Sequence, residues 1–278
     1  MLKYINDTYN FSFPFKIINK QINSKIIIKV LKNNKQVTEI TILEGMHKES
    51  LEQSFISFKK GEQNLPSVKF SKSMQTYFKK NMVPKRLESA LLWPTKNNQV
   101  PKNSTIKIKV GRQDPLKENQ IIKKILKTKG VRLRIDGNKL CTSGQMNKIL
   151  KDIPHTTVEY IEDSFINRCE EINFTKNTAY KMAMDEDILS YFINKNWKDF
   201  PTHIKHVVIK LSLIGGVNEL NYITRNLDRK NITYNLSSTF DGPLAIKFLY
   251  SLSKRKKYKK MKLPGLDTLR FMTKKKEP

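Results

Sequence analysis

Six short apolar runs recur at nearly even intervals between Thr105 and Ser238, and each of them ends in a polar residue. The last residues of these runs are Lys109, Asp136, Glu162, Asp185, Lys210 and Ser237, and the steps between them are 27, 26, 23, 25 and 27 residues. Such a step accommodates one strand, one loop and one helix, which is the repeat of a (β/α) barrel. Because the C-terminal ends of barrel strands converge on one mouth, we expect these polar side chains to lie close together.

The segments between the runs carry helix signals. Asp114 and Pro115 predict an N-cap followed by the first helical residue, and Gly130 predicts the end of that helix. Further helices are expected over residues 144–150 and 188–193, after Gly215-Gly216 and after Gly242-Pro243. This alternation of strands and helices predicts an α/β protein.

The residues before the repeat predict a small α+β unit. Strands are expected over residues 25–32 and 36–43, joined by a turn at Asn33-Asn34, and two amphipathic helices follow Gly45 and Pro66. Residues 87–94 are a candidate first barrel strand, but only about ten residues separate them from Thr105, too few for a full helix. We therefore expect a stunted first βα unit, and an eighth strand end near residues 264–268.

Composition places the chain among globular proteins. Its 278 residues are 38% hydrophobic and 9% aromatic, enough for a full core. No apolar run approaches the roughly 18 residues of a membrane span, and the N-terminus does not resemble a signal peptide. Cys141 and Cys169 are too few for a disulfide framework and lack metal-ligand spacing. These features predict a cytoplasmic protein without a membrane partner.

The formal net charge is +28, which raises the question of a nucleic-acid partner. The charge is spread along the whole chain and comes mostly from lysine. The densest basic run is Lys254–Lys262, and such a run is more often a solvated face than a polyanion site. We therefore expect no nucleic-acid partner, and the sequence leaves monomer and homo-oligomer equally open.

The strand ends combine carboxylates with lysines. Three carboxylates, Asp136, Glu162 and Asp185, suit Mg²⁺, which prefers oxygen ligands. Lys107 and Lys109 share one face of a strand, and two partly desolvated ammonium groups lower each other's pKa, which favours a lysine base. The step of the repeat would place another cation, Lys210, across the barrel. Together these groups suit removal of a proton next to a carboxylate.

Each of these residues also has an ordinary structural interpretation. A single lysine or aspartate at a strand end is usually an exposed loop residue. Only the common spacing of the strand-end residues distinguishes them from such loop residues. Gly215-Gly216 and Ser237-Ser238 fit simple turns, or they fit N–H groups that bind a substrate carboxylate. The four histidines, His47, His155, His203 and His206, share no motif, and we interpret them as structural.

The strand-end motifs resemble those of the enolase superfamily. TIKIKVG is similar to the Lys-x-Lys strand, RIDGN, YIED and AMDED to the three metal strands, VVIK to the opposing lysine, and NLSSTFDG to the Ser-Ser strand end. LPGLDTL resembles a C-terminal segment of the o-succinylbenzoate synthase family. VTEITILEG and LPSVKFS resemble segments of the capping domain.

This resemblance implies a modified (β/α)₇β TIM barrel over residues 85–268, with an N-terminal α+β capping domain over residues 1–84 that includes the tail 269–278. It implies Mg²⁺ on Asp136, Glu162 and Asp185, a small-molecule carboxylate substrate, Lys109 as the base, Lys210 as a stabilising cation, and Lys107 as the residue that tunes Lys109 and contacts the carboxylate. The substrate-binding residues would be Asn138, Gly215, Gly216, Ser237, Ser238 and Gly265. The implied reaction is the syn dehydration that forms 2-succinylbenzoate for menaquinone biosynthesis.

Several positions depart from the family pattern. Asp163-Ser164 and Leu211 stand where these enzymes often have proline, but all metal ligands and lysines are present, so we expect activity. Two other functions stay open. One is a racemase or epimerase that acts on N-acylamino acids or dipeptides with the same residues. The other is a basic, non-catalytic nucleic-acid-binding protein.

Overall fold

A computed structural model of the chain describes residues 1–17, 20–85 and 87–275. The chain divides into two compact units. Unit 1 comprises Met1–Glu88, Lys210–Asn226 and Leu236–Pro278, and unit 2 comprises Ser89–Ile209 and Leu227–Asn235. The domain boundary between residues 84 and 85 stays a prediction, and residues 276–278 of the predicted tail lie outside the described residues.

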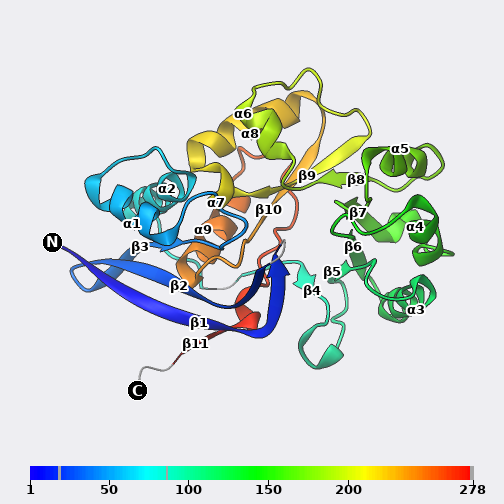
Figure 1. The fold of residues 1–278 in the computed structure, drawn as a ribbon, viewed down its shortest axis with the longest axis horizontal. Coiled ribbons are helices and arrows are strands. Elements are labelled where there is room, and N and C mark those ends of the chain that lie inside the picture. The colour runs from blue at the N-terminus through cyan, green and yellow to red at the C-terminus, as the bar shows by residue number, and fades with distance from the viewer. Residues whose placement is uncertain (18–19, 86, 276–278) are drawn as a thin grey trace. The chain divides into compact units, whose positions relative to one another are not determined.

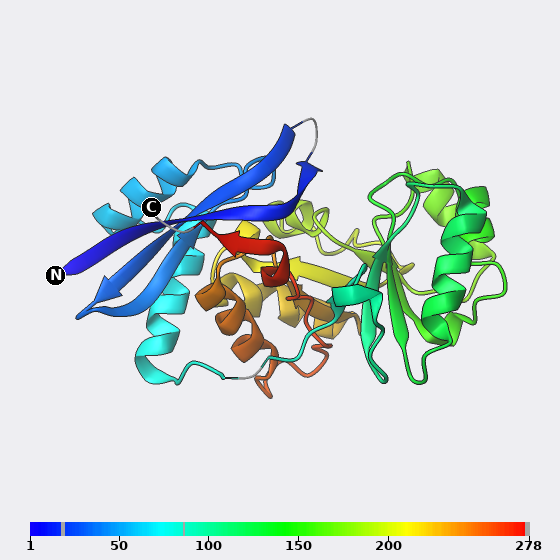
Figure 2. The same ribbon diagram turned by 90° about the horizontal axis from the view of Figure 1, so that it is seen from below.

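Unit 1 contains a four-stranded antiparallel sheet in the order β11-β1-β2-β3 (Figure 1). Its strands are β1 (Leu2–Ile17), β2 (Lys20–Lys32), β3 (Lys35–Thr41) and β11 (Met272–Lys274). The predicted turn between β2 and β3 is confirmed, because Asn33 and Asn34 both have left-handed backbones, with φ of 51° and 58°. The last strand, β11, pairs with the first, so the two ends of the chain share one sheet (Figure 2).

Two helices, α1 (Leu51–Lys60) and α2 (Pro66–Lys80), pack on this sheet. Their shared core contains Ile28, Val30, Ile40, Phe58 and Val68. A capping box starts α1, in which the Ser50 hydroxyl accepts from the Gln53 N–H and the Gln53 side chain accepts from the Ser50 N–H. Both helices were expected from the spacing of their apolar residues.

Seven strands form the second sheet, in the order β10-β9-β8-β7-β6-β5-β4, and the neighbouring strands from β4 to β9 pair in parallel. The strands are β4 (Leu91–Leu92), β5 (Thr105–Lys109), β6 (Arg132–Asp136), β7 (Val158–Glu162), β8 (Met182–Met184), β9 (Ile204–Lys210) and β10 (Thr233–Ser237). Five of the six predicted strand ends are confirmed, and Asp185 follows β8 directly. The even repeat therefore located the parallel strands correctly.

The connections also follow the expected order. The helices of this part are α3 (Pro115–Leu126), α4 (Ser143–Ile149), α5 (Arg168–Lys176), α6 (Ile188–Ile193), α7 (Leu211–Ile214), α8 (Val217–Arg229) and α9 (Pro243–Ser253), and short 3-10 turns lie at Lys96–Asn98, His155–Thr157 and Leu269–Phe271. Only the first of these turns lies between β4 and β5, as the stunted first unit predicted. Figure 2 shows α3 and α4 on one side of β5–β7.

The eighth barrel strand is reduced to a single bridge within unit 1. Ser237 and Gly265 form a parallel bridge, in which the Gly265 N–H donates to the Leu236 carbonyl at 2.8 Å and the Ser238 N–H donates to the Gly265 carbonyl at 3.1 Å. The segment predicted to supply an eighth strand end therefore lies along the end of β10.

Among the described residues, no helix is both long enough and apolar enough to cross a membrane.

Candidate active site

Two rows of side chains share the inner face of unit 2. In the strand register, Lys109 is the partner of Asp136, and Asp136 is the partner of Glu162. Two residues earlier on the same strands, Lys107, Arg134 and Tyr160 are likewise partners. Because residues two apart on a strand point to the same face, the strand ends form an upper row and these residues form a lower row.

Lys107 joins the two rows. Its ammonium Nζ lies 2.9 Å from Asp136 Oδ2 and makes an ion pair with Glu162 Oε1. Both carboxylates are buried, with 7% of Asp136 and 1% of Glu162 exposed. The structure therefore brings together three predicted site residues, two of them predicted metal ligands.

The pKa of Lys107 is shifted in the direction opposite to the expected one. Burial by itself lowers the pKa of Lys107, but the negative charges of Asp136 and Glu162 outweigh it, and the pKa of Lys107 lies well above its usual range. The predicted mutual lowering between two lysines is therefore wrong for Lys107. This side chain stays an ammonium at any physiological pH.

Asn138 orients the other oxygen of Asp136. The Asn138 backbone N–H donates to Asp136 Oδ1 at 3.2 Å, and its side-chain amide donates to the same atom at 2.6 Å. A left-handed backbone with φ of 47° at Asn138 makes this compact turn possible. Asn138 thus orients a predicted metal ligand by hydrogen bonds, and its contact with substrate stays a prediction.

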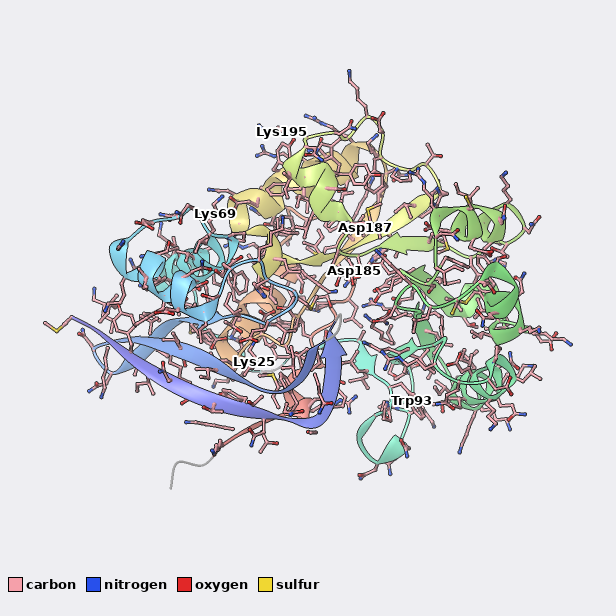
Figure 3. The ribbon with its side chains drawn as sticks, in the orientation of Figure 1. Lys25, Lys69, Trp93, Asp185, Asp187 and Lys195 are labelled. Carbon is pink, nitrogen blue, oxygen red and sulfur yellow. The ribbon has the colours of Figure 1, made fainter. Side chains whose placement is uncertain are left out.

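Lys109 belongs to the upper row, and Asp185 directly follows strand β8. Asp185 is buried and begins the loop after β8, where its N–H donates to Asp163 Oδ1 at 3.4 Å (Figure 3). Lys109 is the exposed last residue of β5. Within the described ranges, no group of three His, Cys, Asp or Glu side chains is arranged to hold a metal ion. The three predicted ligands are therefore not preassembled as one chelating group.

The donor set nevertheless fits Mg²⁺. Asp136 and Glu162 already face one positive charge, because both contact the ammonium of Lys107. Mg²⁺ is commonly held by one or two carboxylates, with water and substrate oxygens completing its shell. These two side chains meet that requirement, and Asp185 as a third ligand remains a prediction.

The lower row is an aromatic and cationic stack. The Arg134 guanidinium lies 5.1 Å above the Tyr160 ring, and the His206 ring stacks on Tyr160 at 4.3 Å with planes 16° apart. The Tyr160 hydroxyl donates to Asn235 Oδ1 at 3.0 Å, and His206 Nε2 lies 2.6 Å from the same oxygen. The interior below the carboxylates is therefore polar and hydrogen-bonded.

A β-bulge on β7 makes this stack possible. The register passes from Leu133 opposite Val158 to Arg134 opposite Tyr160, so Glu159 is an extra residue. Arg134 Nε donates to Glu159 Oε2 at 2.7 Å while its plane covers Tyr160. The bulge thus gives the buried Arg134 both a counter-ion and an aromatic partner.

Sequence reasoning missed Arg134, Tyr160 and Asn235, and it interpreted His206 only as structural. A usable signal was present, because Arg134, Tyr160 and Asn235 each lie two residues before a predicted strand end. That spacing places them on the same inner face as the strand-end residues.

The other predicted site residues belong to unit 1. Lys210 ends β9, half-buried, and its place opposite the two lysines stays a prediction. The Gly215 N–H donates to the Leu211 carbonyl, and the Gly216 N–H donates to Glu219 Oε2 at 2.8 Å. A Cβ at Gly216 would lie 2.1 Å from Ser73 Oγ. Packing against α2 thus explains Gly216, and substrate contact by either glycine stays a prediction.

Ser237, Ser238 and Gly265 lie together at the end of β10. Ser238 Oγ accepts from the Asp241 N–H at 2.9 Å and from the Thr268 hydroxyl at 3.0 Å, and the Ser237 hydroxyl donates to the Gly265 carbonyl at 3.3 Å. The structure brings these three residues together in one turn. Their role in substrate binding stays a prediction.

Solved structures define the class of fold. The chain matches an o-succinylbenzoate synthase from Thermosynechococcus elongatus BP-1 with Mg in its active site, with a TM-score of 0.68, 18% identity and coverage of 100% of this chain and 95% of the other. It matches the substrate-liganded L-Ala-D/L-Glu epimerase of Bacillus subtilis (TM-score 0.69, 14% identity, 98% and 90% coverage) and a muconate lactonizing enzyme of Pseudomonas fluorescens (0.70, 11%, 98% and 88%). The predicted fold, a modified TIM barrel with an N-terminal α+β domain, is therefore confirmed.

Curated sequences lead to one kind of enzyme. The o-succinylbenzoate synthase of Pasteurella multocida is 26% identical over 180 residues, which are 63% of this chain and 53% of that protein. The synthase of Vibrio cholerae serotype O1 is 24% identical over 219 residues, 73% of this chain and 65% of that protein. The chain thus spans about half to two-thirds of these relatives, and no family model matches it. The resemblance inferred from the strand-end motifs is confirmed.

Proposed function

We propose that this protein is an o-succinylbenzoate synthase. It would convert 2-succinyl-6-hydroxy-2,4-cyclohexadiene-1-carboxylate to 2-succinylbenzoate by syn dehydration, in menaquinone biosynthesis. The observation that carries the proposal is the arrangement of the upper row. The carboxylates of Asp136 and Glu162 both contact the Lys107 ammonium there, and Lys109 is the register partner of Asp136. Similarity to synthases of two organisms supports the choice of reaction.

In this proposal, Lys109 moves the proton. Its neutral amine removes the proton next to the substrate carboxylate, and the resulting ammonium returns that proton to the departing hydroxyl on the same face. Water leaves, the ring becomes aromatic, and Lys109 is again neutral. Lys109 is the last residue of β5 and the register partner of Asp136, and we assign the proton transfer to it, whereas Lys107 contributes a positive charge on the same face.

The remaining residues stabilise charge. Mg²⁺ bound by Asp136, Glu162 and Asp185 supplies stabilisation of the negative charge that develops on the substrate carboxylate. Lys210 would contribute a second positive charge, and Asn138 holds Asp136 in the orientation that faces the cation. Arg134 adds a fixed positive charge in the lower row, and this charge interacts with that of Glu162.

The direct test is loss of diene absorbance when purified protein is mixed with Mg²⁺ and the cyclohexadiene carboxylate. We expect turnover that requires the metal, and a fall in kcat of about 10²- to 10⁴-fold for Lys109→Ala, the size typical of a lost general base. The matched control is Lys124→Ala, an exposed lysine on α3, which should retain wild-type kcat. Full activity of Lys109→Ala would refute the assignment of the base.

A racemase or epimerase function is the second candidate. Dipeptide epimerases and an N-succinyl Arg/Lys racemase are among the structures of the same fold, with TM-scores of 0.68 to 0.70. In that reaction Lys109 and Lys210 would exchange protons on opposite faces of one carbon. Deuterium incorporation from D₂O into an N-succinylamino acid or a dipeptide, without dehydration of the diene, would favour this candidate.

A further inference from the structure

We propose that Lys107 is an internal counter-ion that competes with the divalent cation for Asp136 and Glu162. Binding of the metal displaces the ammonium, so that the carboxylates exchange one cation for the other. This inference rests on the proposed function, because it takes these two carboxylates as metal ligands. It adds a role for Lys107 that precedes any contact with substrate.

The ammonium and the metal would contact the same carboxylate oxygen atoms. Asn138 holds Asp136 Oδ1 through two hydrogen bonds, so a cation approaches Asp136 through Oδ2. Oδ2 is the atom that Lys107 Nζ contacts at 2.9 Å, and the same Nζ is paired with Glu162 Oε1. A Mg²⁺ ion must lie about 2.0–2.1 Å from each oxygen ligand. The ammonium and the metal therefore need the same space.

The two buried carboxylates need a positive charge nearby when no metal is bound. Asp136 and Glu162 are buried on neighbouring strands, and two buried negative charges require a compensating cation. Arg134, the other cation of the lower row, is engaged with Glu159 and lies on the Tyr160 ring. The ammonium of Lys107 contacts both carboxylates and supplies such a charge.

The Lys107 side chain is flexible enough to leave the carboxylates when the metal binds. The Lys107 side chain is 17% exposed and has four methylene groups, so Nζ can move away without a change in the strand. Arg134 has no such freedom, because its ion pair and the ring stack fix its plane. An ammonium released by the metal stays on the face that also presents Lys109, where a substrate carboxylate would meet it.

The experiment measures Mg²⁺ affinity by isothermal titration calorimetry, without substrate, for the wild-type protein, Lys107→Met and Lys109→Met. The second variant removes the same charge from the same face of β5 and is the matched control. We expect Lys107→Met to lower the Kd for Mg²⁺ by about tenfold or more, equivalent to roughly 1.4 kcal/mol. We expect Lys109→Met to change it by less than about threefold, because screening weakens an exposed charge.

Thermal unfolding gives an independent reading on the same proteins. In EDTA, Lys107→Met should unfold at a lower temperature than the wild type, since two buried carboxylates lose their counter-ion. Saturating Mg²⁺ should restore it, so the shift caused by Mg²⁺ is larger than in the wild type or in Lys109→Met. Lys107→Gln, which keeps a polar side chain, is the second variant if Lys107→Met cannot be purified.

The outcomes separate this inference from the proposed function. Unchanged or weaker Mg²⁺ binding by Lys107→Met, or equal tightening in both variants, overturns the competition. In the latter case the loss of one positive charge anywhere on the face explains the effect. If the wild type and both variants bind no Mg²⁺, the metal-dependent function fails, and the exchange fails with it.

Discussion

At the scale of single residues, Glu39 links the antiparallel sheet of unit 1 to α9. Its buried carboxylate accepts from the N–H groups of Leu244 at 3.3 Å and Ala245 at 2.9 Å, in the first turn of that helix. The N-cap residue of α9 is Gly242, which has no side chain to cap the helix. Glu39 therefore supplies the missing cap from another part of the chain.

The ionisation of Glu39 predicts a pH dependence of stability. Burial raises the pKa of Glu39 to about 7, although the α9 N–H groups oppose the increase. Since the folded pKa is above the unfolded value, this contribution to stability is present below about pH 4.5 and is lost as the pH rises through 7. We expect the urea midpoint to fall between pH 5 and pH 8 more in the wild type than in Glu39→Gln. The exposed Glu62→Gln should behave as the wild type, and equal slopes in all three would contradict the prediction.

The residues of the candidate site show what a sequence pattern reveals at this scale. Lys107, Asp136 and Glu162 were predicted as neighbours because strand register aligns residues at equal positions of a repeat. The pKa of Lys107 was predicted to be lowered but is raised. The direction of this shift depends on how closely Nζ approaches the carboxylates, which the sequence does not show. Arg134 was missed because buried arginines are rare, and its partner Glu159 reaches it only through a bulge.

At the scale of elements, Asp7 fastens the C-terminal strand β11 to the sheet of unit 1. Its buried carboxylate pairs with Lys29 on β2 and lies 2.9 Å from Lys274 Nζ on β11. Burial acts to raise the pKa of Asp7, but the two lysines outweigh it and hold the pKa below its usual range. One side chain therefore connects three neighbouring strands.

Asp7→Asn should loosen β11 selectively. We expect a cost of about 1–3 kcal/mol, because a buried ion pair is replaced by a neutral group. The amide of Lys275, which donates to the Thr8 carbonyl at 2.8 Å, reports the opening through its hydrogen-exchange rate. Since the pKa of Asp7 is lowered, the wild type should show the same loosening only as the pH falls below about 4.

The control for this prediction is Asp152→Asn. Asp152 pairs with Lys123 at 3.1 Å, but both side chains are largely exposed, so we expect almost no change. Equal exchange of the Lys275 amide in Asp7→Asn and in the wild type would show that Asp7 does not hold β11.

Prediction of the elements succeeded where the apolar period was regular. The strand ends and α3, α4, α6, α8 and α9 followed from turn residues and apolar spacing. Helix α5 was missed because only Phe174 in it is buried, so it has almost no apolar stripe. Strand β1 was missed because its 16 residues mix aromatic, polar and charged side chains without a strict alternation. Its pairing with β11 joins opposite ends of the chain, which local patterns do not encode.

At the scale of the whole molecule, the net charge is +28, and its positive residues are spread along the chain. The basic run Lys254–Lys262 is held against its neighbours in unit 1. Lys254 pairs with Glu88 at 2.9 Å, Arg255 lies 4.8 Å above the Tyr77 ring, and Lys257 donates to Asn221 Oδ1 at 2.7 Å. Three side chains of the run are therefore held by contacts within unit 1, and the absence of a nucleic-acid partner stays a prediction.

Self-repulsion of this charge predicts a response to salt. Raising NaCl from about 20 mM to about 300 mM shortens the screening length, so we expect the unfolding temperature to rise by about 2–4 °C. In the same salt series, binding to a fluorescent single-stranded RNA should disappear well below 150 mM. Saturable RNA binding that persists above that concentration would favour the nucleic-acid hypothesis over the enzyme.

The pairing of β1 with β11 has a consequence for biosynthesis. Every segment of unit 2 has left the ribosome once Asn235 has emerged, whereas β1, which precedes unit 2 in the chain, waits for β11, which follows it. The usual order, in which N-terminal parts fold first, is therefore reversed. The nascent chain carries an incomplete sheet edge until β11 has emerged, and during this stage a chaperone has the most reason to bind it.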